Sequence, residues 1–291
     1  MLTRAIARGD IAGASRLISP APAGASEGGD SSAAPGRLQP VPLVEACPGV
    51  EREVRTPSGL LRCYCVRRPV GEVLPDAVAA AREYDRVLRG ARQRLDELEA
   101  PAALCRIADA GPEDVLFMDT ETCGLSGSAV FLVGTMRCAE GGLFFEQFLA
   151  RHYAEEPAIL QEFAGRLEGA GALVTFNGKS FDMSLIRERS AFHRIELPRR
   201  GVWHLDLLHE CRRRYRGRVP NCRLQTLERA FCGRVRAGDI PSAAIPDAYH
   251  RFVSTGDARQ MRDILHHNAL DLLTMAQLLC AVLTGVEPIE A

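Results

Sequence analysis

The order of the apolar segments between residues 115 and 208 constrains the fold more than any other feature of the sequence. Three short apolar segments come first, and the Gly141-Gly142 turn joins the second and third of them as a hairpin. The later apolar segments alternate with segments of helical periodicity. Three consecutive strands followed by alternating helices and strands predict a mixed α/β sheet flanked by helices. The predicted strands are 115–119, 129–137, 143–150, 172–176 and 202–208, and the predicted helices between them are 155–168 and 180–191.

The chain consists of three regions that differ in composition. Residues 1–40 are predicted to form a flexible tail, because a long part of this region contains only Gly, Ala, Ser and Pro apart from two acids. Residues 41–110 are predicted to be an N-terminal extension, with a hairpin within 50–70 and an amphipathic helix over 77–98. Residues 111–286 hold the main α/β domain, and the last part of this domain is predicted to be helical.

The composition excludes several classes of protein. With 46% hydrophobic and 25% charged residues, the chain resembles a globular protein rather than a disordered one. No uninterrupted apolar run approaches the roughly 18–20 residues that span a bilayer. Arg8 and Asp10 interrupt the apolar start that a signal peptide needs. Ten cysteines without an export signal are expected to be reduced, and the lack of a C-x-x-C motif argues against zinc. We therefore expect a cytoplasmic protein that binds no membrane.

The formal net charge of −1 conceals a basic segment. The stretch from Arg187 to Arg218 contains ten arginines and only four acidic residues. Such a segment is typical of a polyanion-binding surface, and also of a solvated helix rich in arginine. Because Lys179 is the only lysine among the 36 basic residues, the abundance of arginine does not by itself indicate a nucleic-acid-binding protein. Both interpretations stay open at this point.

Two acidic residues close the first predicted strand of the main domain. Asp119 and Glu121 are two positions apart, so both side chains point to the same face of the strand. Neighbouring anions repel each other and destabilise the fold unless a cation compensates them. Oxygen ligands of this kind suit Mg²⁺ or Mn²⁺. The pair is therefore a candidate metal site, and a solvated strand end is the alternative.

A second polar motif, Asn177 to Asp182, follows the fourth predicted strand and opens a helix. Ligand sites in α/β sheets lie at this end of the strands. Asp182 falls in the first turn of the helix, where favourable interaction with the helix dipole is sufficient to explain a carboxylate. Lys179 is the only lysine of the chain, and either it has a chemical role or it was retained by chance.

The third motif lies in an apolar helical stretch near the end of the chain. Asp271 is surrounded by leucines, and an acid in such a position needs a partner or a metal. His267 lies four residues earlier on the same helical face, whereas His266 reaches the same site only if the helix starts or breaks there. Either histidine could act as a general base, and His267 is favoured if the helix is continuous.

Together these motifs resemble those of the DEDD (DnaQ-like) 3′–5′ exonuclease superfamily, and within it the YprB-type bacterial ribonuclease-H-like proteins. The resemblance covers residues from about 112 to 285. It implies a ribonuclease-H-like α/β fold with a mixed five-stranded sheet, three antiparallel strands then parallel strands, flanked by helices. A helical C-terminus and a small N-terminal extension complete the expected fold. The segments that carry the resemblance are Asp119–Leu125, Phe176–Asp182, Leu205–His209 and Leu265–Asp271.

The resemblance also implies a chemistry. Members of this superfamily hydrolyse phosphodiester bonds with two divalent metal ions, Mg²⁺ or Mn²⁺, at the 3′ end of DNA or RNA. His266 fits the histidine spacing of one subclass, and His267 occupies the position that holds tyrosine in the other. The residues that correspond to the four metal-binding acids are Asp119, Glu121, Asp182 and Asp271.

The resemblance further suggests residues that contact the substrate. Gly124 and Leu125 match the loop that lies against the terminal nucleotide in such exonucleases. Cys123 departs from the family pattern, which usually has threonine there, and a thiol is a poor Mg²⁺ ligand, so we expect it to pack. The other candidates for substrate contact are Thr122, Asn177, Lys179 and Phe181. Few aromatic side chains are candidates for base stacking, and core packing explains most of them; they are Phe131, Phe181, Trp203 and Tyr215.

Two functional hypotheses follow from these residues. The favoured one is a metal-dependent nuclease that acts on the end of a nucleic acid, because all four acids and a candidate base are present. The alternative is a non-catalytic nucleic-acid-binding or scaffold protein on the same fold, which would bind through the basic segment in a strongly salt-dependent manner. If the four acids lay far apart, a helical interaction module would be the remaining interpretation.

Overall fold

The structure, a computed structural model, describes residues 39–97, 101–124, 127–139, 141–198 and 201–289. The predicted tail (1–40) falls almost wholly outside the described residues, and Leu125 falls outside them as well. The fold discussed below is that of the unit Gln39–Ala291.

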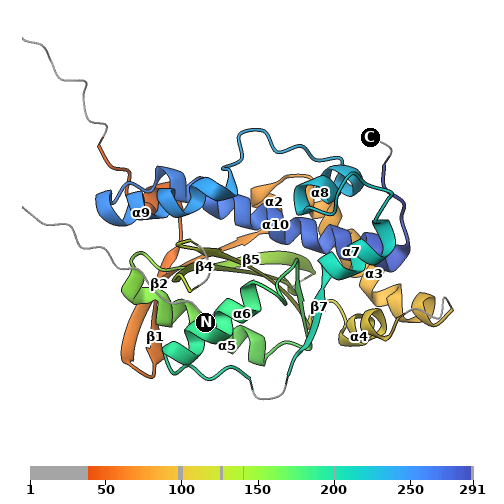
Figure 1. Ribbon diagram of the computed structural model, residues 1–291, viewed down its shortest axis with the longest axis horizontal. Coiled ribbons are helices and arrows are strands. Elements are labelled where there is room, and N and C mark those ends of the chain that lie inside the picture. The colour runs from red at the N-terminus through yellow and green to blue at the C-terminus, as the bar shows by residue number, and fades with distance from the viewer. Residues whose placement is uncertain (1–38, 98–100, 125–126, 140, 199–200, 290–291) are drawn as a thin grey trace, which may run out of the picture. The chain divides into compact units, whose positions relative to one another are not determined.

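A mixed sheet forms the centre of this unit (Figure 1). The strand order is β1-β2-β5-β4-β3-β6-β7. Neighbours from β1 to β3 pair antiparallel, whereas β3, β6 and β7 pair parallel. The strands are β1 (Val50–Thr56), β2 (Gly59–Pro69), β3 (Val115–Thr122), β4 (Val130–Ala139), β5 (Gly142–Leu149), β6 (Ala172–Thr175) and β7 (Trp203–Asp206).

The structure confirms the predicted mixed α/β class, but the sheet has seven strands rather than the five expected. The sequence analysis assigned the 50–70 hairpin to a separate extension. Its second strand instead pairs antiparallel with β5, so that Tyr64 lies opposite Leu149. Without this pairing β5 would present an open row of backbone donors and acceptors, which proteins avoid. The hairpin thus continues the sheet.

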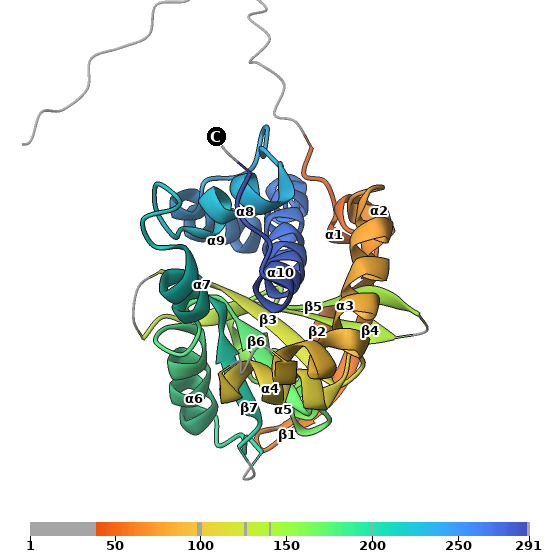
Figure 2. The same cartoon turned by 90° about the vertical axis from the view of Figure 1, so that its right-hand side faces the viewer.

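Helices cover both faces of the sheet (Figures 1 and 2). Helices α5 and α6 lie on one face, and α10 lies over the other with α8 and α9 beside it. The long amphipathic helix α3 packs against α10. The helices are α1 (Leu43–Ala46), α2 (Val70–Val73), α3 (Ala77–Glu97), α4 (Ala102–Ala110), α5 (Glu156–Glu168), α6 (Asp182–Phe192), α7 (Leu207–Tyr215), α8 (Leu224–Cys232), α9 (Ile245–Thr255) and α10 (Arg259–Thr284), with short 3₁₀ turns at Tyr153–Glu155 and Ser242–Ala244.

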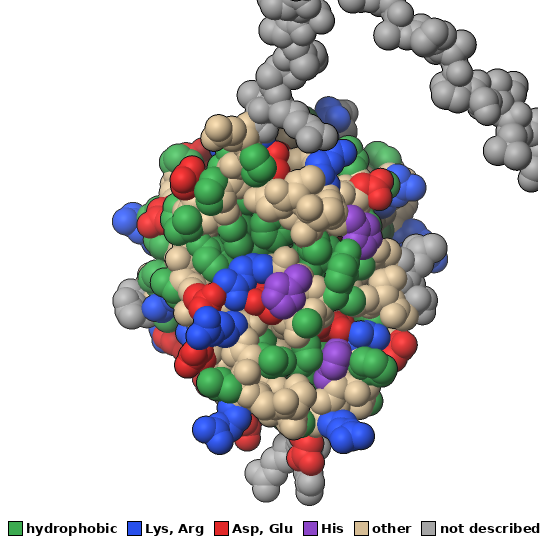
Figure 3. Space-filling model, turned by 90° about the vertical axis from the view of Figure 1, so that its left-hand side faces the viewer, with side chains coloured by type: hydrophobic (Ala, Val, Ile, Leu, Met, Phe, Trp, Pro, Cys, Tyr) green, Lys and Arg blue, Asp and Glu red, His purple; other side chains and the backbone are tan. Residues whose placement is uncertain are grey.

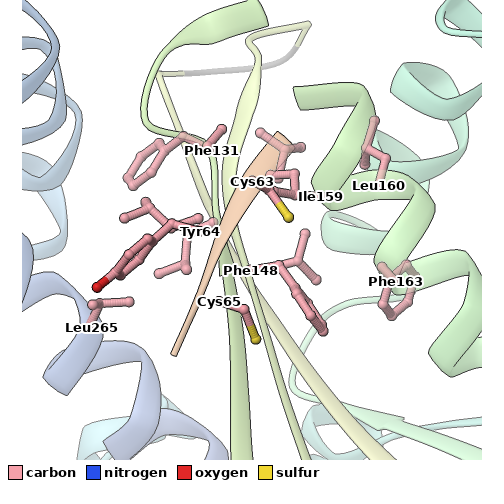
Figure 4. Close-up of a cluster of buried hydrophobic side chains, with 14 of the residues drawn as sticks. Cys63, Tyr64, Cys65, Phe131, Phe148, Ile159, Leu160, Phe163 and Leu265 are labelled. Atoms are coloured by element: carbon pink, nitrogen blue, oxygen red, sulfur yellow. The ribbon is translucent and has the colours of Figure 1, made fainter. Parts of the chain in front are cut away.

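Hydrophobic side chains fill the space on both sides of the sheet. In β2, Cys63 and Cys65 point towards α5, whereas Tyr64 between them points towards the side where Phe131 and Leu265 lie (Figure 4). The two-residue repeat of a strand produces this alternation. Burial raises the pKa of the Cys63 thiol to about 12, so it stays protonated as a packing group.

The fifth predicted strand is shorter than expected. Strand β7 ends at Asp206, and helix α7 begins at Leu207, so the prediction of a strand up to residue 208 was wrong for its last two residues. The carboxylate of Asp206 accepts a hydrogen bond from the backbone N–H of Leu208 (3.1 Å) and thereby caps the helix. Side-chain capping of this kind stabilises a helix start, and it overrides the apolar strand-like pattern.

Helix α10 is long and apolar enough to cross a membrane, which no other helix of the described residues is. An apolar helical stretch was predicted here, but no run of bilayer length, because polar residues such as His266 and Asp271 interrupt the apolar residues. The apolar window of this helix is 83% buried within the fold. Its hydrophobicity is therefore that of a core helix of the fold.

Charged side chains of both signs are mixed on one face of the molecule. On the face shown in Figure 3, Lys and Arg side chains lie among Asp and Glu side chains rather than in a separate patch. A mixed surface of this kind is ordinary for a globular protein with a net charge near zero. A local cluster of unpaired positive or negative side chains elsewhere in the structure therefore indicates a candidate binding site.

Candidate active site: carboxylates between strand β3 and helix α10

Strand β3 directs Asp119 and Glu121 towards the face of the sheet that α10 covers. Phe117 packs in the same hydrophobic cluster as the α10 side chains, and Asp119 follows it by two positions on the same face. The pairing of β3 with β4 becomes irregular between Glu121 and Thr122. Both acids are half-buried. The end of β3 thus holds two carboxylates beneath α10.

Asp182 reaches the same end of β3 from the first residue of α6. The hydroxyl of Thr120 donates a hydrogen bond to Oδ1 of Asp182. The start of a helix favours a negative charge, so α6 supports this carboxylate as well. Asp182 is therefore attached to the strand that carries the first two acids.

The fourth acid, Asp271, comes from the middle of α10. Burial, followed by the charges of Asp271, Glu121 and Asp182, raises the pKa of Asp119 well above its usual range. Burial and the charges of Asp271 and Asp182 raise the pKa of Glu121 in the same way. Asp119 and Asp271 also line one cleft. Asp182 is hydrogen-bonded to Thr120, which lies between Asp119 and Glu121, so the four acids lie in one region of the structure. The structure thus brings together the four acids that the sequence analysis singled out.

Asn268 holds Asp119 in place. Its Nδ2 donates to Oδ2 of Asp119 (2.8 Å), while its Oδ1 accepts from Nε2 of Gln147 (2.8 Å). Asn268 and Gln147 are both fully buried. Gly134 on β4 leaves the necessary room, since a Cβ there would lie 1.9 Å from Oδ1 of Asn268. The sequence analysis gave Asn268 no role, although it lies three positions before Asp271 on the same helical face.

Arg236 forms an ion pair with Asp271 that the sequence analysis did not predict. Its Nη2 lies 2.6 Å from Oδ1 of Asp271, and its Nε lies 2.6 Å from Oε2 of Glu228. Glu228 on α8 is completely buried and also accepts from Oγ1 of Thr274 (2.8 Å). Removing such charges from water is costly, so each of them needs its partner. Although burial raises the pKa of Asp271, Arg236 opposes this shift.

The two candidate histidines lie in different surroundings. Helix α10 is continuous, and His267 is buried with Nε2 3.6 Å from Oδ2 of Asp271. Its Nδ1 lies 2.8 Å from Oδ2 of Asp239, a residue of the loop before α9 that the sequence analysis missed. His266 is half-buried and instead lines a neighbouring pocket with Arg68. Only His267 therefore contacts the acidic cluster directly.

The loop after β6 is held by Asp206. The carboxylate of Asp206 accepts from the backbone N–H of Asn177 (2.7 Å) and of Lys179 (3.1 Å). Asn177 adopts a left-handed conformation (φ 65°), which asparagine tolerates better than most residues. Asp206 is thus a structural carboxylate. The side chains of Lys179 and Phe181 are exposed.

The turn after β3 contains the other candidate substrate contacts. Oγ1 of Thr122 donates to the carbonyl oxygen of Gly124 (2.7 Å), so its hydroxyl is engaged within the turn. The φ of Gly124 is 155°, a conformation that favours glycine. Cys123 is partly buried against the core, and burial raises its pKa to about 12, which agrees with a packing role. The following Leu125 lies outside the described residues.

Of the aromatic residues considered for base stacking, Phe181 is the exposed one. Its side chain is 66% exposed. Phe131 is buried and stacks on Tyr249, and Tyr215 is buried as well, as core packing predicts. The ring of Trp203 is covered by the guanidinium of Arg106.

The acidic cluster fits divalent cations in part. Its donors are carboxylate oxygens, which suit Mg²⁺ or Mn²⁺, and burial together with neighbouring carboxylates raises the pKa of Asp119 and of Glu121, a shift that a bound cation would oppose. Against this, one of the four acids is already paired with Arg236. In addition, no three His, Cys, Asp or Glu side chains among the described residues are arranged closely enough to hold a metal ion.

A cleft of about 680 Å³ opens next to the acidic cluster. Asp119 and Asp271 line it, together with Phe176 and Asn177 from the loop after β6. The remaining lining residues come from α7, from the α7–α8 connection and from the start of α8. The acids are therefore accessible to a ligand that enters between the sheet edge and these helices.

Comparison with known proteins identifies the family. A sequence model of the RNase H superfamily matches residues 116–283, which include all four acids. The chain is also 33% identical over 169 residues to the uncharacterized protein YprB of Bacillus subtilis (strain 168). That match covers 57% of this chain and 41% of the relative, so the chain spans less than half of the length of YprB. The extent of the match, on a mixed sheet flanked by helices, shows that the chain belongs to the RNase H superfamily and is YprB-like within it.

Proposed function

We propose that this chain is a metal-dependent nuclease of the DEDD type, a 3′–5′ exonuclease that hydrolyses phosphodiester bonds of DNA or RNA. The observation that carries the proposal is the convergence of four acids from three separate elements: Asp119 and Asp271 line one cleft, and Asp182 is hydrogen-bonded to Thr120 between Asp119 and Glu121. Carboxylates that raise one another's pKa destabilise a fold, and divalent cations are the usual compensation. Membership in the RNase H superfamily supports a nuclease-type function for this site.

The exonuclease resemblance implies that the four acids hold two Mg²⁺ or Mn²⁺ ions, which requires their carboxylates to lie closer together than they do in this structure. Bound there, the ions would lower the pKa of an attacking water and neutralise charge on the phosphate. Asn268 orients the carboxylate of Asp119 by its 2.8 Å hydrogen bond, and Thr120 orients that of Asp182. These contacts fix the carboxylates before substrate arrives, which lowers the cost of assembling the site.

His267 is the proposed general base, and His266 is the alternative. The carboxylate of Asp239 next to Nδ1 of His267 favours the tautomer with its proton on that nitrogen. Nε2 is then left as the acceptor, and it faces Asp271. A base in this position can take the proton from a water molecule bound at the acids.

The proposed substrate is the end of a nucleic-acid strand, and the proposed location is the cytoplasm. The exposed ring of Phe181 would stack on a terminal base. Lys179, whose side chain is exposed, would contact a phosphate. The other proposed contacts with the terminal nucleotide come from Thr122, Gly124, Leu125 and Asn177.

An end-labelling assay tests the proposal. The purified chain is incubated with single strands of DNA and RNA labelled at the 5′ end, with Mn²⁺, with Mg²⁺ and with EDTA. We expect a ladder that shortens from the 3′ end only when a divalent ion is present. Asp119→Asn and Asp271→Asn should abolish the ladder, whereas Asp96→Asn, on the exposed surface of α3, should not. No cleavage by the parent chain with either metal would contradict the proposal.

One observation favours the second candidate, a non-catalytic nucleic-acid-binding or scaffold protein. Arg236 already compensates Asp271, as it would in a site that no longer binds a full set of metal ions. This candidate predicts salt-dependent binding of nucleic acid, and no hydrolysis in the presence of either Mn²⁺ or Mg²⁺. The labelled strands of the same assay distinguish the two candidates, because binding can be measured on them by gel shift.

A further inference from the structure

We propose that Arg212, Arg216 and Arg223 form a phosphate-binding wall that leads a single nucleic-acid strand to the carboxylates. This inference rests on the proposed function and adds the surface through which the substrate is held. Arg212 lies on α7, Arg216 in the α7–α8 connection, and Arg223 immediately before α8. All three line the cleft that Asp119 and Asp271 also line.

The three wall arginines lack partners within the described part of the chain. No side-chain hydrogen bond, ion pair or ring contact with another described residue involves Arg212, Arg216 or Arg223, and all three are exposed. An arginine carries five donors in a fixed planar group. Three such groups beside one cleft offer an array of donors to phosphate oxygens, which guanidinium groups can bind in a bidentate manner.

Neighbouring arginines outside the cleft are engaged in contacts within the protein. Arg213 pairs with Glu210 (2.6 Å), and Arg218 pairs with Glu287 (2.7 Å). Arg214 donates from Nη1 to the carbonyl oxygen of Val282 (2.7 Å). The arginines of α7 and the α7–α8 connection therefore divide into those that contact other parts of the protein and those that are left for a ligand. Within α7 and the α7–α8 connection, the arginines that line the cleft are the ones without a side-chain partner.

The apolar part of the lining favours nucleic acid over other polyanions. Phe176, Leu208, Val219 and Leu224 line the same cleft as the arginines. Nucleotides present a charged phosphate and an apolar base face together, and single-strand sites combine both kinds of contact. A cleft of about 680 Å³ is the size of a site for one small ligand, so it suits the end of one strand.

The three arginines also offset the repulsion between a phosphate backbone and the acidic cluster. Phosphates are repelled by ionised carboxylates, and Asp119 and Asp271 line the same cleft as the arginines. Arginines on one wall attract the backbone and let the strand approach the acids from the α7–α8 side, where Figure 2 shows both helices beside α10. The wall therefore sets the direction from which a strand enters.

A binding experiment tests the wall separately from catalysis. The full chain in EDTA is titrated into a fluorescein-labelled single-stranded oligonucleotide, as DNA and as RNA, at several salt concentrations. Arg212→Gln, Arg216→Gln and Arg223→Gln are compared with Arg213→Gln and Arg218→Gln, which remove the same charge outside the cleft. Each wall variant should weaken binding several-fold and reduce the salt slope of log K by about 0.7, the value for one phosphate contact on a single strand. The control variants should change the affinity by less than about twofold, as expected for charges that contact no phosphate.

The outcomes separate this inference from the proposed hydrolysis. Equal weakening by wall and control variants would overturn the wall, because it would indicate only diffuse attraction. Displacement of the oligonucleotide by polyglutamate at equal charge concentration would overturn the assignment to nucleic acid. Selective loss of binding in the wall variants supports the wall even if the parent chain cleaves nothing. Thermal unfolding of each variant, expected to match the parent because these side chains are exposed, checks that the fold is retained.

Discussion

The guanidinium of Arg236 lies 2.6 Å from Oδ1 of Asp271, so a cation of the protein itself meets one of the four clustered acids. Both side chains are largely buried, with 4% and 16% of their surface exposed. Glu228 fixes the other side of the guanidinium. A divalent ion at Asp271 must therefore share this carboxylate with Arg236 or displace it, and the stability of the chain should depend on which cation is present.

Replacing Arg236 tests this relationship. In Arg236→Met, Asp271 and Glu228 lose a buried partner, and breaking a buried pair in this way typically destabilises a protein by about 3–5 kcal/mol. We expect a loss of this size in urea unfolding without metal, and partial recovery when Mn²⁺ is added. Arg218→Met removes an exposed pair with Glu287 and should cost about 1 kcal/mol or less. A metal-free Arg236→Met chain as stable as the parent would contradict a structural role for the pair.

The clustered acids should destabilise the metal-free protein at neutral pH. Because burial and neighbouring carboxylates raise the pKa of Asp119, its contribution to stability is full below its unfolded pKa of about 4 and is lost as the pH rises through the folded pKa. Asp119→Asn keeps an acceptor for Asn268 but removes the charge. We therefore expect a higher melting temperature than the parent at pH 7 in EDTA, and a difference that shrinks as the pH falls towards 4.

Addition of Mn²⁺ should make the melting temperature of the parent higher than that of Asp119→Asn. The parent gains stability from metal binding, since a ligand that binds only the folded state shifts the unfolding equilibrium, whereas Asp119→Asn should gain much less. Asp96→Asn, an exposed helix variant, serves as the control in both conditions. A parent melting temperature that does not respond to Mn²⁺ or Mg²⁺ would argue against a metal site.

Gly134 supports the site through a close approach rather than through its backbone conformation. A Cβ at this position would lie 1.9 Å from Oδ1 of Asn268, so Gly134→Ala must displace the side chain that holds Asp119. We expect a loss of about 1–3 kcal/mol in the free energy of unfolding, as for other overpacked cores. Cleavage should fall together with stability. The matched variant Gly165→Ala, on the exposed side of α5 with nothing within 4 Å, should instead stabilise the helix by roughly 0.5–1 kcal/mol.

Single strands and helices could be predicted from the sequence because the spacing of apolar residues within each segment determines them. The apolar run 115–119 and the acids that follow it define β3, and the strand period alone places Asp119 and Glu121 on one face. The helix over 77–98 is visible from its periodicity and is present as α3. The arrangement of three antiparallel strands followed by parallel strands was implied by the family resemblance, and the main domain has it.

The parts that the sequence did not predict depend on contacts between distant segments. Pairing of β2 with β5 joins positions about 80 residues apart, and no local pattern specifies that edge. Arg236 and Asp239 lie in an irregular loop, so their approach to α10 follows from tertiary packing rather than from periodicity. No sequence signal marked the buried Glu228, because its partners Arg236 and Thr274 are not its sequence neighbours.

Replacing each of the two histidines tests which one is the general base, since the continuous helix α10 directs their side chains to different surroundings. Nε2 of His267 lies 3.6 Å from Asp271 and its Nδ1 is held by Asp239, whereas His266 lines another pocket. If His267 is the base, His267→Gln should lower kcat by about 10²–10⁴-fold with KM little changed, because proton transfer contributes that much to such reactions. His266→Gln should lower kcat only a few-fold. The opposite order would assign the proton transfer to His266 and would require α10 to open or turn at its first half when substrate binds.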